Sequence, residues 1–295
     1  MEATLFRVLY RHVQSVAHPG RPRVQFPDRA IVLVYLWSVL HDRPVSWACD
    51  RRNWPAALLA FELPSDTTMS RRLRTVGVRQ LLERVLLAAS DLFGPPPLVK
   101  AIDSKPMTVG AYSKDADARR GRVGAGQMAR GYRLHALTHG RVVRHWTLGA
   151  MNDHDAAHAP VLLARLEGGG GYAVADNAYD SNALHAAAAA AGHQLVAPPK
   201  AAERHVRDGR YNTPQRLRAL DLLASPLESC GAPDRFGIAL YNHRETVESC
   251  FGELSLTGLN YLPAWVRGPR RVALWAAGKV LLHTLRCAIR QRLTA

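Results

Sequence analysis

The feature that most constrains the fold is a stiff connector of one glycine and three prolines at residues 94–97, where the spacing of apolar residues changes. Before it, the apolar run Ile31–Leu40 and the amphipathic stretch Val78–Phe93 have helical character. We therefore expect residues 1–95 to form an all-helical domain. After the connector, short apolar runs bounded by turn residues predict strands alternating with helices, so residues 96–295 are expected to form an α/β domain.

The order of the predicted elements narrows the fold further. Strands are expected over 98–103, 132–138, 142–151, 172–176 and 194–197. A helix beginning at Asp153 or Asp155 is expected between the third and fourth strands, and a helix over 182–191 between the fourth and fifth. This order matches a ribonuclease-H-like fold, a mixed sheet flanked by helices. Residues 113–126 are expected to be a loop, residues 201–240 an irregular insertion, and residues 270–292 a basic amphipathic helix.

Two aspartates occupy the ends of predicted strands. Asp103 ends the run Leu98–Asp103, and Asp176 ends the run Tyr172–Asp176. A rigid strand holds such a carboxylate in place better than a loop does. With a third carboxylate nearby, the pair can hold two divalent metal ions about 4 Å apart, the arrangement used for in-line phosphoryl transfer. The competing nearby aspartates are Asp115, Asp117, Asp153, Asp155 and Asp180, the last of which we expect to cap the next helix.

The third carboxylate is predicted to be Glu248. At 100° per residue, Tyr241, Arg244 and Glu248 share one face of a helix, whereas Glu245 falls outside it. A guanidinium at this position suits bidentate binding of a phosphate, and a tyrosine can hydrogen-bond or stack beside it. The alternative is a solvated, charged helix face without a ligand.

The residues around these carboxylates carry a family resemblance. The segment Asp176–Ser181, followed by Ala197-Pro198-Pro199-Lys200, resembles the second-aspartate region of DDE transposases from bacterial insertion sequences. The spacing of Tyr241, Arg244 and Glu248 resembles the signature of the insertion-sequence-four group, which continues with a lysine where this chain has Ser255. The strand Gly131–His135 is also similar to one that follows the first aspartate in that group.

The resemblance implies a transposase that cuts DNA at transposon ends and joins the freed 3′ hydroxyl to target DNA. It implies that Asp103, Asp176 and Glu248 are catalytic and bind two Mg²⁺ ions, for which Mn²⁺ can substitute, within a homo-oligomer on DNA. Two alternatives stay open: a stand-alone nuclease of the same fold, and a DNA-binding protein that has lost catalysis, since Ser255 offers a neutral hydroxyl where the family has a cation.

The charge of the chain favours a polyanionic partner, and the lack of a run of about 20 apolar residues leads us to expect no membrane span. Its formal net charge is +15, and from Leu254 onward there are seven basic residues and no acidic one. We expect a cytoplasmic, nucleoid-associated protein, with residues 1–95 as a DNA-binding domain. The arginines expected to contact DNA, besides Arg244, are Arg119, Arg120, Arg122, Arg267, Arg270 and Arg271. The last three are also candidates to supply the charge that Ser255 lacks.

Two further groups of side chains have competing interpretations. Arg71, Arg72 and Arg74 follow a helix start signal and form either a DNA-contacting helix or a solvated face of a structural bundle. His154 and His158 have the i, i+4 spacing of a metal-binding pair, but we expect both to be solvated.

Overall fold

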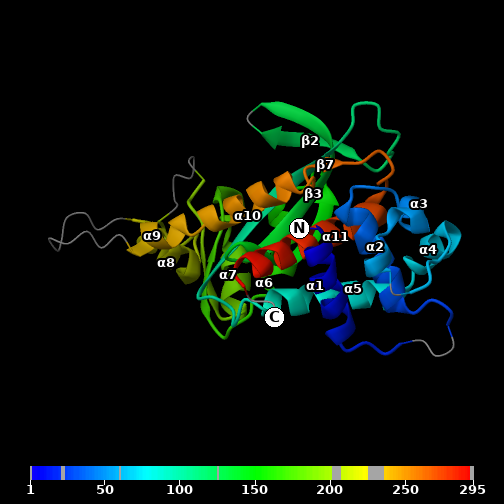
Figure 1. The fold of residues 1–295 in the computed structure, drawn as a ribbon. Coiled ribbons are helices and arrows are strands. Elements are labelled where there is room, and N and C mark those ends of the chain that lie inside the picture. The colour runs from blue at the N-terminus through cyan, green and yellow to red at the C-terminus, as the bar shows by residue number, and fades with distance from the viewer. Residues whose placement is uncertain are drawn as a thin grey trace. The chain divides into compact units, whose positions relative to one another are not determined.

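The computed structural model describes residues 2–20, 24–59, 61–124, 126–200, 207–224 and 236–292 (Figure 1). The chain forms two compact units, one made of residues 1–94 with 256–295, the other of residues 95–255. The predicted boundary at the proline connector therefore coincides with a unit boundary. The grouping of residues 256–295 differs from the prediction, because they pack with the N-terminal helices.

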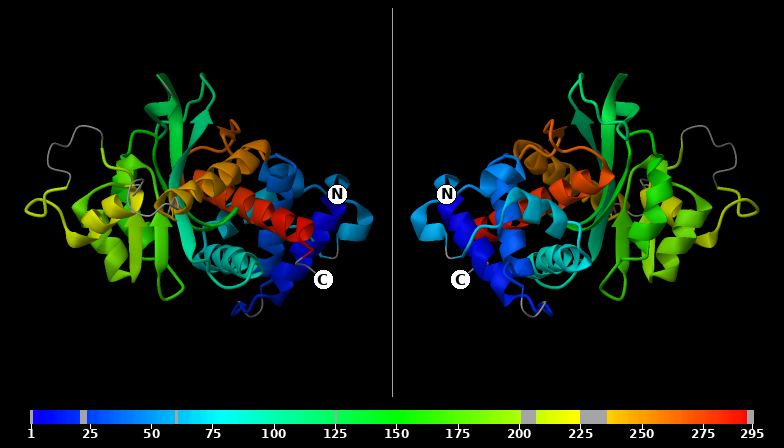
Figure 2. Two further views of the ribbon diagram at one scale, coloured as in Figure 1. Left: turned by 90° about the vertical axis from the view of Figure 1, so that its left-hand side faces the viewer. Right: turned by 90° about the vertical axis from the view of Figure 1, so that its right-hand side faces the viewer.

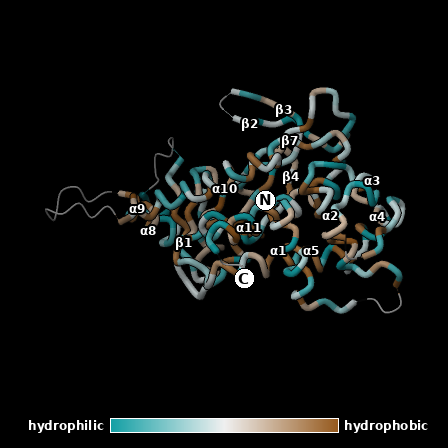
Figure 3. The backbone as a smooth tube through the Cα atoms, viewed as in Figure 1, coloured by the Kyte–Doolittle hydropathy of each residue, from teal (hydrophilic) through white to brown (hydrophobic). Residues whose placement is uncertain are grey.

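Unit 1 is mainly helical. Its N-terminal part contains five α-helices and two short 3₁₀ helices: α1 (Glu2–Ser15), α2 (Asp28–Leu40), α3 (Val45–Ala48), η1 (Arg51–Asn53), η2 (Ala56–Leu58), α4 (Asp66–Arg72) and α5 (Val76–Asp91). Its C-terminal part contains β7 (Tyr261–Leu262) and α11 (Pro269–Arg290). α2 is apolar around almost its whole circumference (Figure 3), as expected of a helix that is buried on all sides.

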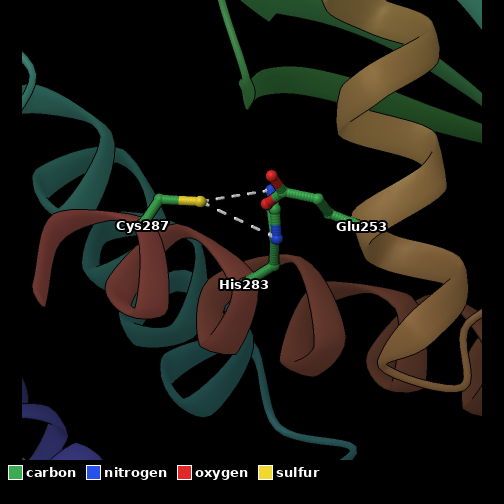
Figure 4. Close-up of side chains that lie close together, drawn as sticks. All are labelled: Glu253, His283 and Cys287. Atoms are coloured by element: carbon green, nitrogen blue, oxygen red, sulfur yellow. Dashed lines mark hydrogen bonds between the residues drawn. The ribbon is translucent and has the colours of Figure 1, made fainter. Parts of the chain in front are cut away.

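The helix predicted over residues 270–292 is present as α11, but it is a core element of unit 1 and more buried than a basic amphipathic helix would be. It packs against α1, α2 and α5. Its length and composition would suit a membrane span, but 78% of its most apolar stretch is buried inside the protein. Along it, His283 and Cys287 lie one turn apart, with the cysteine sulfur 3.6 Å from Nε2 of the imidazole (Figure 4). Its arginines at positions 270, 271, 286 and 290 lie toward its two ends, while the middle is mostly apolar.

Of the arginines on α4, one is structural. Arg72 is buried and donates to Asp28 at 2.6 Å and to the carbonyl of Phe26 at 2.7 Å. Arg71 on the same helix and Arg74 just beyond it are exposed. Of the two interpretations, the structural one therefore holds for Arg72, while both stay open for Arg71 and Arg74.

Unit 2 is built on a mixed sheet. Its strands are β1 (Val99–Val109), β2 (Arg119–Gly124), β3 (Gln127–His139), β4 (Val142–Ala150), β5 (Gly171–Val174) and β6 (His193–Val196). Antiparallel β3 joins β1 to β2 and β4, whereas β1, β5 and β6 run parallel. The predicted loop at residues 113–126 is wrong in its second half, because residues 119–124 pair with β3 in a ladder that projects from the sheet (Figure 1, Figure 2).

Helices flank this sheet. They are α6 (Asp155–Leu163), η3 (Asn177–Tyr179), α7 (Asn182–Ala190), α8 (Pro214–Leu223), α9 (Phe236–Asn242) and α10 (Glu245–Leu256). Ile102 on β1 and Leu137 on β3 join a buried cluster with apolar residues of α6 and α7. Because side chains alternate along a strand, Asp103 and Lys105 point away from that cluster. The insertion at 201–240 is not wholly irregular, since α8 packs on α7 and β6; residues 201–206 and 225–235 lie outside the described residues.

Asp180 has a different role from the predicted helix cap. Ser181 caps α7 by accepting from the amide of Leu184. The carboxylate of Asp180 is fully buried and accepts from Arg216 of α8 at 2.8 and 2.5 Å and from His185 of α7 at 3.1 Å. This buried ion pair fastens α8 to the sheet domain.

Candidate active site

The register of the parallel strands sets Asp103 and Asp176 side by side. The last pair of β1 and β5 is Ala101 with Val174, and each aspartate lies two residues beyond it. β5 ends at this point, while β1 continues to Val109, so the prediction that Asp103 ends its strand is wrong. The carboxylates therefore meet where the parallel pairing stops, at the carboxyl ends of neighbouring strands, a common position for ligand sites in α/β sheets.

Both aspartates are held by local hydrogen bonds. Asp103 accepts from the amide of Ser104 at 2.7 Å. Asp176 caps η3 by accepting from the amide of Ala178 at 2.9 Å. These bonds fix the direction of each carboxylate and favour its ionised form.

Burial opposes that ionised form. It raises the pKa of Asp103 to about 6, with smaller contributions from the charges of Asp176 and Asp155, despite the opposing effects of Ser104 and Arg244. Burial likewise raises the pKa of Asp176, aided by Asp155. Raised carboxylate pKa values on adjacent strands mark a candidate functional site.

Arg244 joins Glu248 to this pair. Its guanidinium lies 3.0 Å from Oε1 of Glu248 and 3.6 Å from Oδ2 of Asp103. Burial works against the charge of Arg244, but Asp103, Tyr241, Glu248 and Asp176 outweigh it and raise the arginine pKa. The structure therefore brings together the three predicted carboxylates and Arg244. The side chain of Glu248 is 55% exposed and Asp103 only 15%, so Glu248 lies on the solvent side.

The predicted single helix face is broken at its centre. Tyr241 belongs to α9 and Glu248 to α10, while Arg244 lies in the turn between them. Tight hydrogen bonds carry the chain through this turn, among them the amide of Arg244 to the carbonyl of Tyr241 at 2.9 Å. The charge of Arg244 is influenced by Tyr241, which shows that the two stay close despite the break.

Asp155 is a fourth carboxylate of this region. From the sequence it was only one of several aspartates that competed with Asp103 for the metal-binding role. Its Oδ1 lies 3.4 Å from Nδ1 of His135 and 3.6 Å from Arg133, without a hydrogen bond. Burial, helped by His158 and Arg133, lowers the pKa of His135 to about 3. His135 is therefore neutral, and Arg133 is the positive charge that faces Asp155. Asp155 also raises the pKa of Asp103 and Asp176, two aspartates that are distant from it in sequence.

The two histidines of the i, i+4 pair do not converge. His154 precedes α6 and is exposed. His158 lies 3.1 Å from Asp153 and stacks on His135, with ring centroids 4.0 Å apart. The expectation that His158 is solvated was therefore wrong, and the pair makes no metal site of its own.

The arginines expected to bind DNA fall in two places. Arg119, Arg120 and Arg122 are exposed on β2 of unit 2. In unit 1, a cleft of about 750 Å³ is lined by Arg267, Arg270 and Arg271, together with Arg43 and Arg74 from the N-terminal part of the unit. Trp265 and Trp275 line the same cleft, which gives it apolar surface between the cations.

One contact near the site was not foreseen. Nζ of Lys105 donates to Oγ of Ser255 at 2.5 Å, joining β1 to α10 across 150 positions of sequence. Ser255 is the residue at which the chain departs from the resembled signature. The fold therefore places the cation of Lys105 beside Ser255, which the sequence around Ser255 does not indicate.

Comparison with known proteins gives a family and a fold for the chain. The family model described as a transposase DDE domain matches residues 94–285. A solved structure, the piggyBac transposase synaptic complex with hairpin DNA, matches with a TM-score of 0.51 at 8% identity, covering 100% of this chain and 76% of that one. That likeness concerns the fold and agrees with the ribonuclease-H-like sheet. No curated protein shows significant similarity to the chain. Because the family model matches well over half of its residues, the chain belongs to the transposase DDE domain family.

Proposed function

We propose that this protein is a metal-dependent transposase that cuts DNA at the ends of an insertion sequence and joins the freed 3′ hydroxyl to target DNA. The observation that carries the proposal is the position of Asp103 and Asp176, two residues beyond the last pair of β1 and β5, with Arg244 linking Asp103 to Glu248. Few arrangements other than a metal centre use this concentration of buried negative charge.

The donor set fits hard divalent cations. Asp103, Asp176 and Glu248 offer only oxygen ligands, as Mg²⁺ and Mn²⁺ prefer. Both aspartates are largely removed from solvent, which raises the pKa of each. The guanidinium of Arg244 lies within ion-pair distance of Asp103 and Glu248. Two Mg²⁺ ions bound here would activate the attacking oxygen and stabilise the leaving oxygen of a phosphodiester.

The protein's own residues would bind and orient the DNA strand. Arg244 would contact a phosphate of the strand held at Asp103, because its planar guanidinium suits bidentate contact. Tyr241 lies beside it. The exposed arginines of β2 and those of the unit 1 cleft would contact the backbone of the duplex.

The finer assignment is to the insertion-sequence-four group of bacterial elements. It is supported by the spacing of Tyr241, Arg244 and Glu248, with Ser255 as its one departure. We further propose a homo-oligomer assembled on transposon ends and target DNA, in the cytoplasm and associated with the nucleoid.

The test is DNA cleavage by purified protein, with the terminal sequences of its element as substrate and Mg²⁺ in the buffer. Asp176→Ala and Glu248→Ala should each lower cleavage about 10³-fold or more, because metal ions supply several kcal/mol of transition-state stabilisation. Glu245→Ala, an exposed neighbour on α10, is the matched control and should cleave normally. Full activity in either carboxylate variant would overturn the site. Cleavage without joining to a target would identify a nuclease instead.

Binding of DNA should weaken steeply with salt. Phosphate contacts made by arginines release counterions, so six such contacts would cost about 10³ in affinity between about 50 and 200 mM salt. Fluorescence anisotropy with a labelled duplex measures this slope. Removing Arg120 and Arg122 together, which share a face of β2, should reduce the slope by about 2. An affinity independent of salt would contradict a phosphate-dominated interface.

A further inference from the structure

Lys105 occupies a specific place beside the carboxylates. It follows Asp103 by two residues on β1, so both side chains project from the same face of the strand, about 7 Å apart along it. The ammonium reaches α10, where it donates to Oγ of Ser255 at 2.5 Å. It also lies 5.8 Å from the ring centroid of Phe251, and Ser255 in turn donates to the carbonyl of Phe251 at 2.9 Å.

The charge of Lys105 has no counter-ion. Among the residues that the structure describes, no carboxylate lies within ion-pair distance of its Nζ, whose partner is a neutral hydroxyl. Of the two fully buried lysines, Lys279 is paired with Asp42, whereas Lys100 donates to the carbonyl of Gly170 at 3.1 Å and lies 2.9 Å from Nε2 of His193. A half-buried ammonium without a counter-ion, next to an acidic centre, is suited to an anion that arrives with the substrate.

We propose that Lys105 binds a phosphate of the DNA strand held at Asp103. The positive charge would then come from β1, because α10 has the neutral Ser255 at this place. This inference rests on the proposed function and adds a residue to it. The hydroxyl of Ser255 would orient the ammonium, and the ring of Phe251 would shield its stem from water. The competing role is purely structural, a hydrogen bond that fastens β1 to α10.

The experiment measures the salt dependence of the affinity for a short labelled DNA duplex. Lys105→Met keeps the apolar stem but removes the charge, and should reduce the slope of log affinity against log salt by about 1. Lys105→Arg keeps a cation and should retain the slope of the unmodified protein. The exchange variant Lys105→Ser with Ser255→Lys moves the ammonium from β1 to α10 at the same place, and should restore the slope that Lys105→Met loses. Thermal melting checks that each variant is folded.

The outcomes separate the two claims. An unchanged slope in Lys105→Met would show a structural fastening and overturn the inference, while leaving the proposed function intact if cleavage persists. Failure of the folded exchange variant to recover the slope would overturn it as well, even if Lys105→Met proves unstable. If the unmodified protein binds no DNA, the proposed function itself falls, and the role of Lys105 with it.

Discussion

Replacing Asp103 with asparagine is expected to abolish DNA cleavage and to make the same protein more stable in metal-free buffer. Loss of a metal ligand removes the chemistry. The gain in stability arises because burial raises the pKa of Asp103 to about 6, so its ionised form is disfavoured in the folded protein. A pKa of about 6 in place of the usual aspartate value of about 4 costs the folded protein about 3 kcal/mol of stability at neutral pH. A neutral amide avoids this cost.

The pH dependence gives the sign of this effect. Between about pH 4 and 6 the folded protein holds a proton on Asp103 that the unfolded chain has released, so this group lowers stability as the pH rises. The difference in melting temperature between Asp103→Asn and the unmodified protein should therefore grow over this window and stay constant above it. Asp221→Asn, at an exposed ion pair on α8, is the control and should show no such trend.

Divalent ions should reverse the order of stability. Saturating Mg²⁺ binds the folded, unmodified protein and raises its melting temperature, but should raise that of Asp103→Asn much less. If Asp103→Asn is less stable than the unmodified protein in EDTA at pH 7, the attraction of Arg244 outweighs burial. The carboxylates would then be a structural ion-pair network rather than a metal site.

Removing the carboxylate of Asp180 is expected to destabilise unit 2 by about 3–5 kcal/mol, because Arg216 would be left buried without a counter-ion. Burial opposes ionisation of Asp180, but hydrogen bonds from His185 and Arg216 outweigh it and lower the pKa of the carboxyl. This contribution is therefore present at neutral pH and lost as the pH falls below the usual aspartate range. Urea unfolding of Asp180→Ala measures the loss.

Two further variants isolate the buried charge as the cause. Asp221 also lies on α8, and Asp221→Ala breaks its exposed ion pair with Arg207. This variant should change stability little. Asp180→Leu combined with Arg216→Met removes both charges and should recover most of the loss. If the double variant is as unstable as Asp180→Ala, the defect comes from packing around α7 and α8.

The sequence predicted those parts of the site whose signal is local. Asp103 and Asp176 follow apolar runs, and the parallel register does place them as neighbours. β1 was cut short because Ser104, Lys105 and Pro106 break the apolar run, although β3 pairs with them in the sheet. β2 was missed because alternating arginine and glycine is typical of a loop. The positions of Asp155 and of Lys105 against Ser255 depend on contacts distant in sequence, which no local pattern contains.

The composition of unit 1 from two separate stretches has a consequence for synthesis. On the ribosome, all of residues 95–255 emerge before α11, so the sheet domain can fold while the core of unit 1 is still incomplete. Domains generally fold as they emerge, from the N-terminus onward. Here α1, α2 and α5 must wait, with the apolar surface that α11 covers exposed. A nascent chain interrupted before residue 269 would therefore carry a complete sheet domain and an incomplete N-terminal unit, so the unit that is started first is completed last.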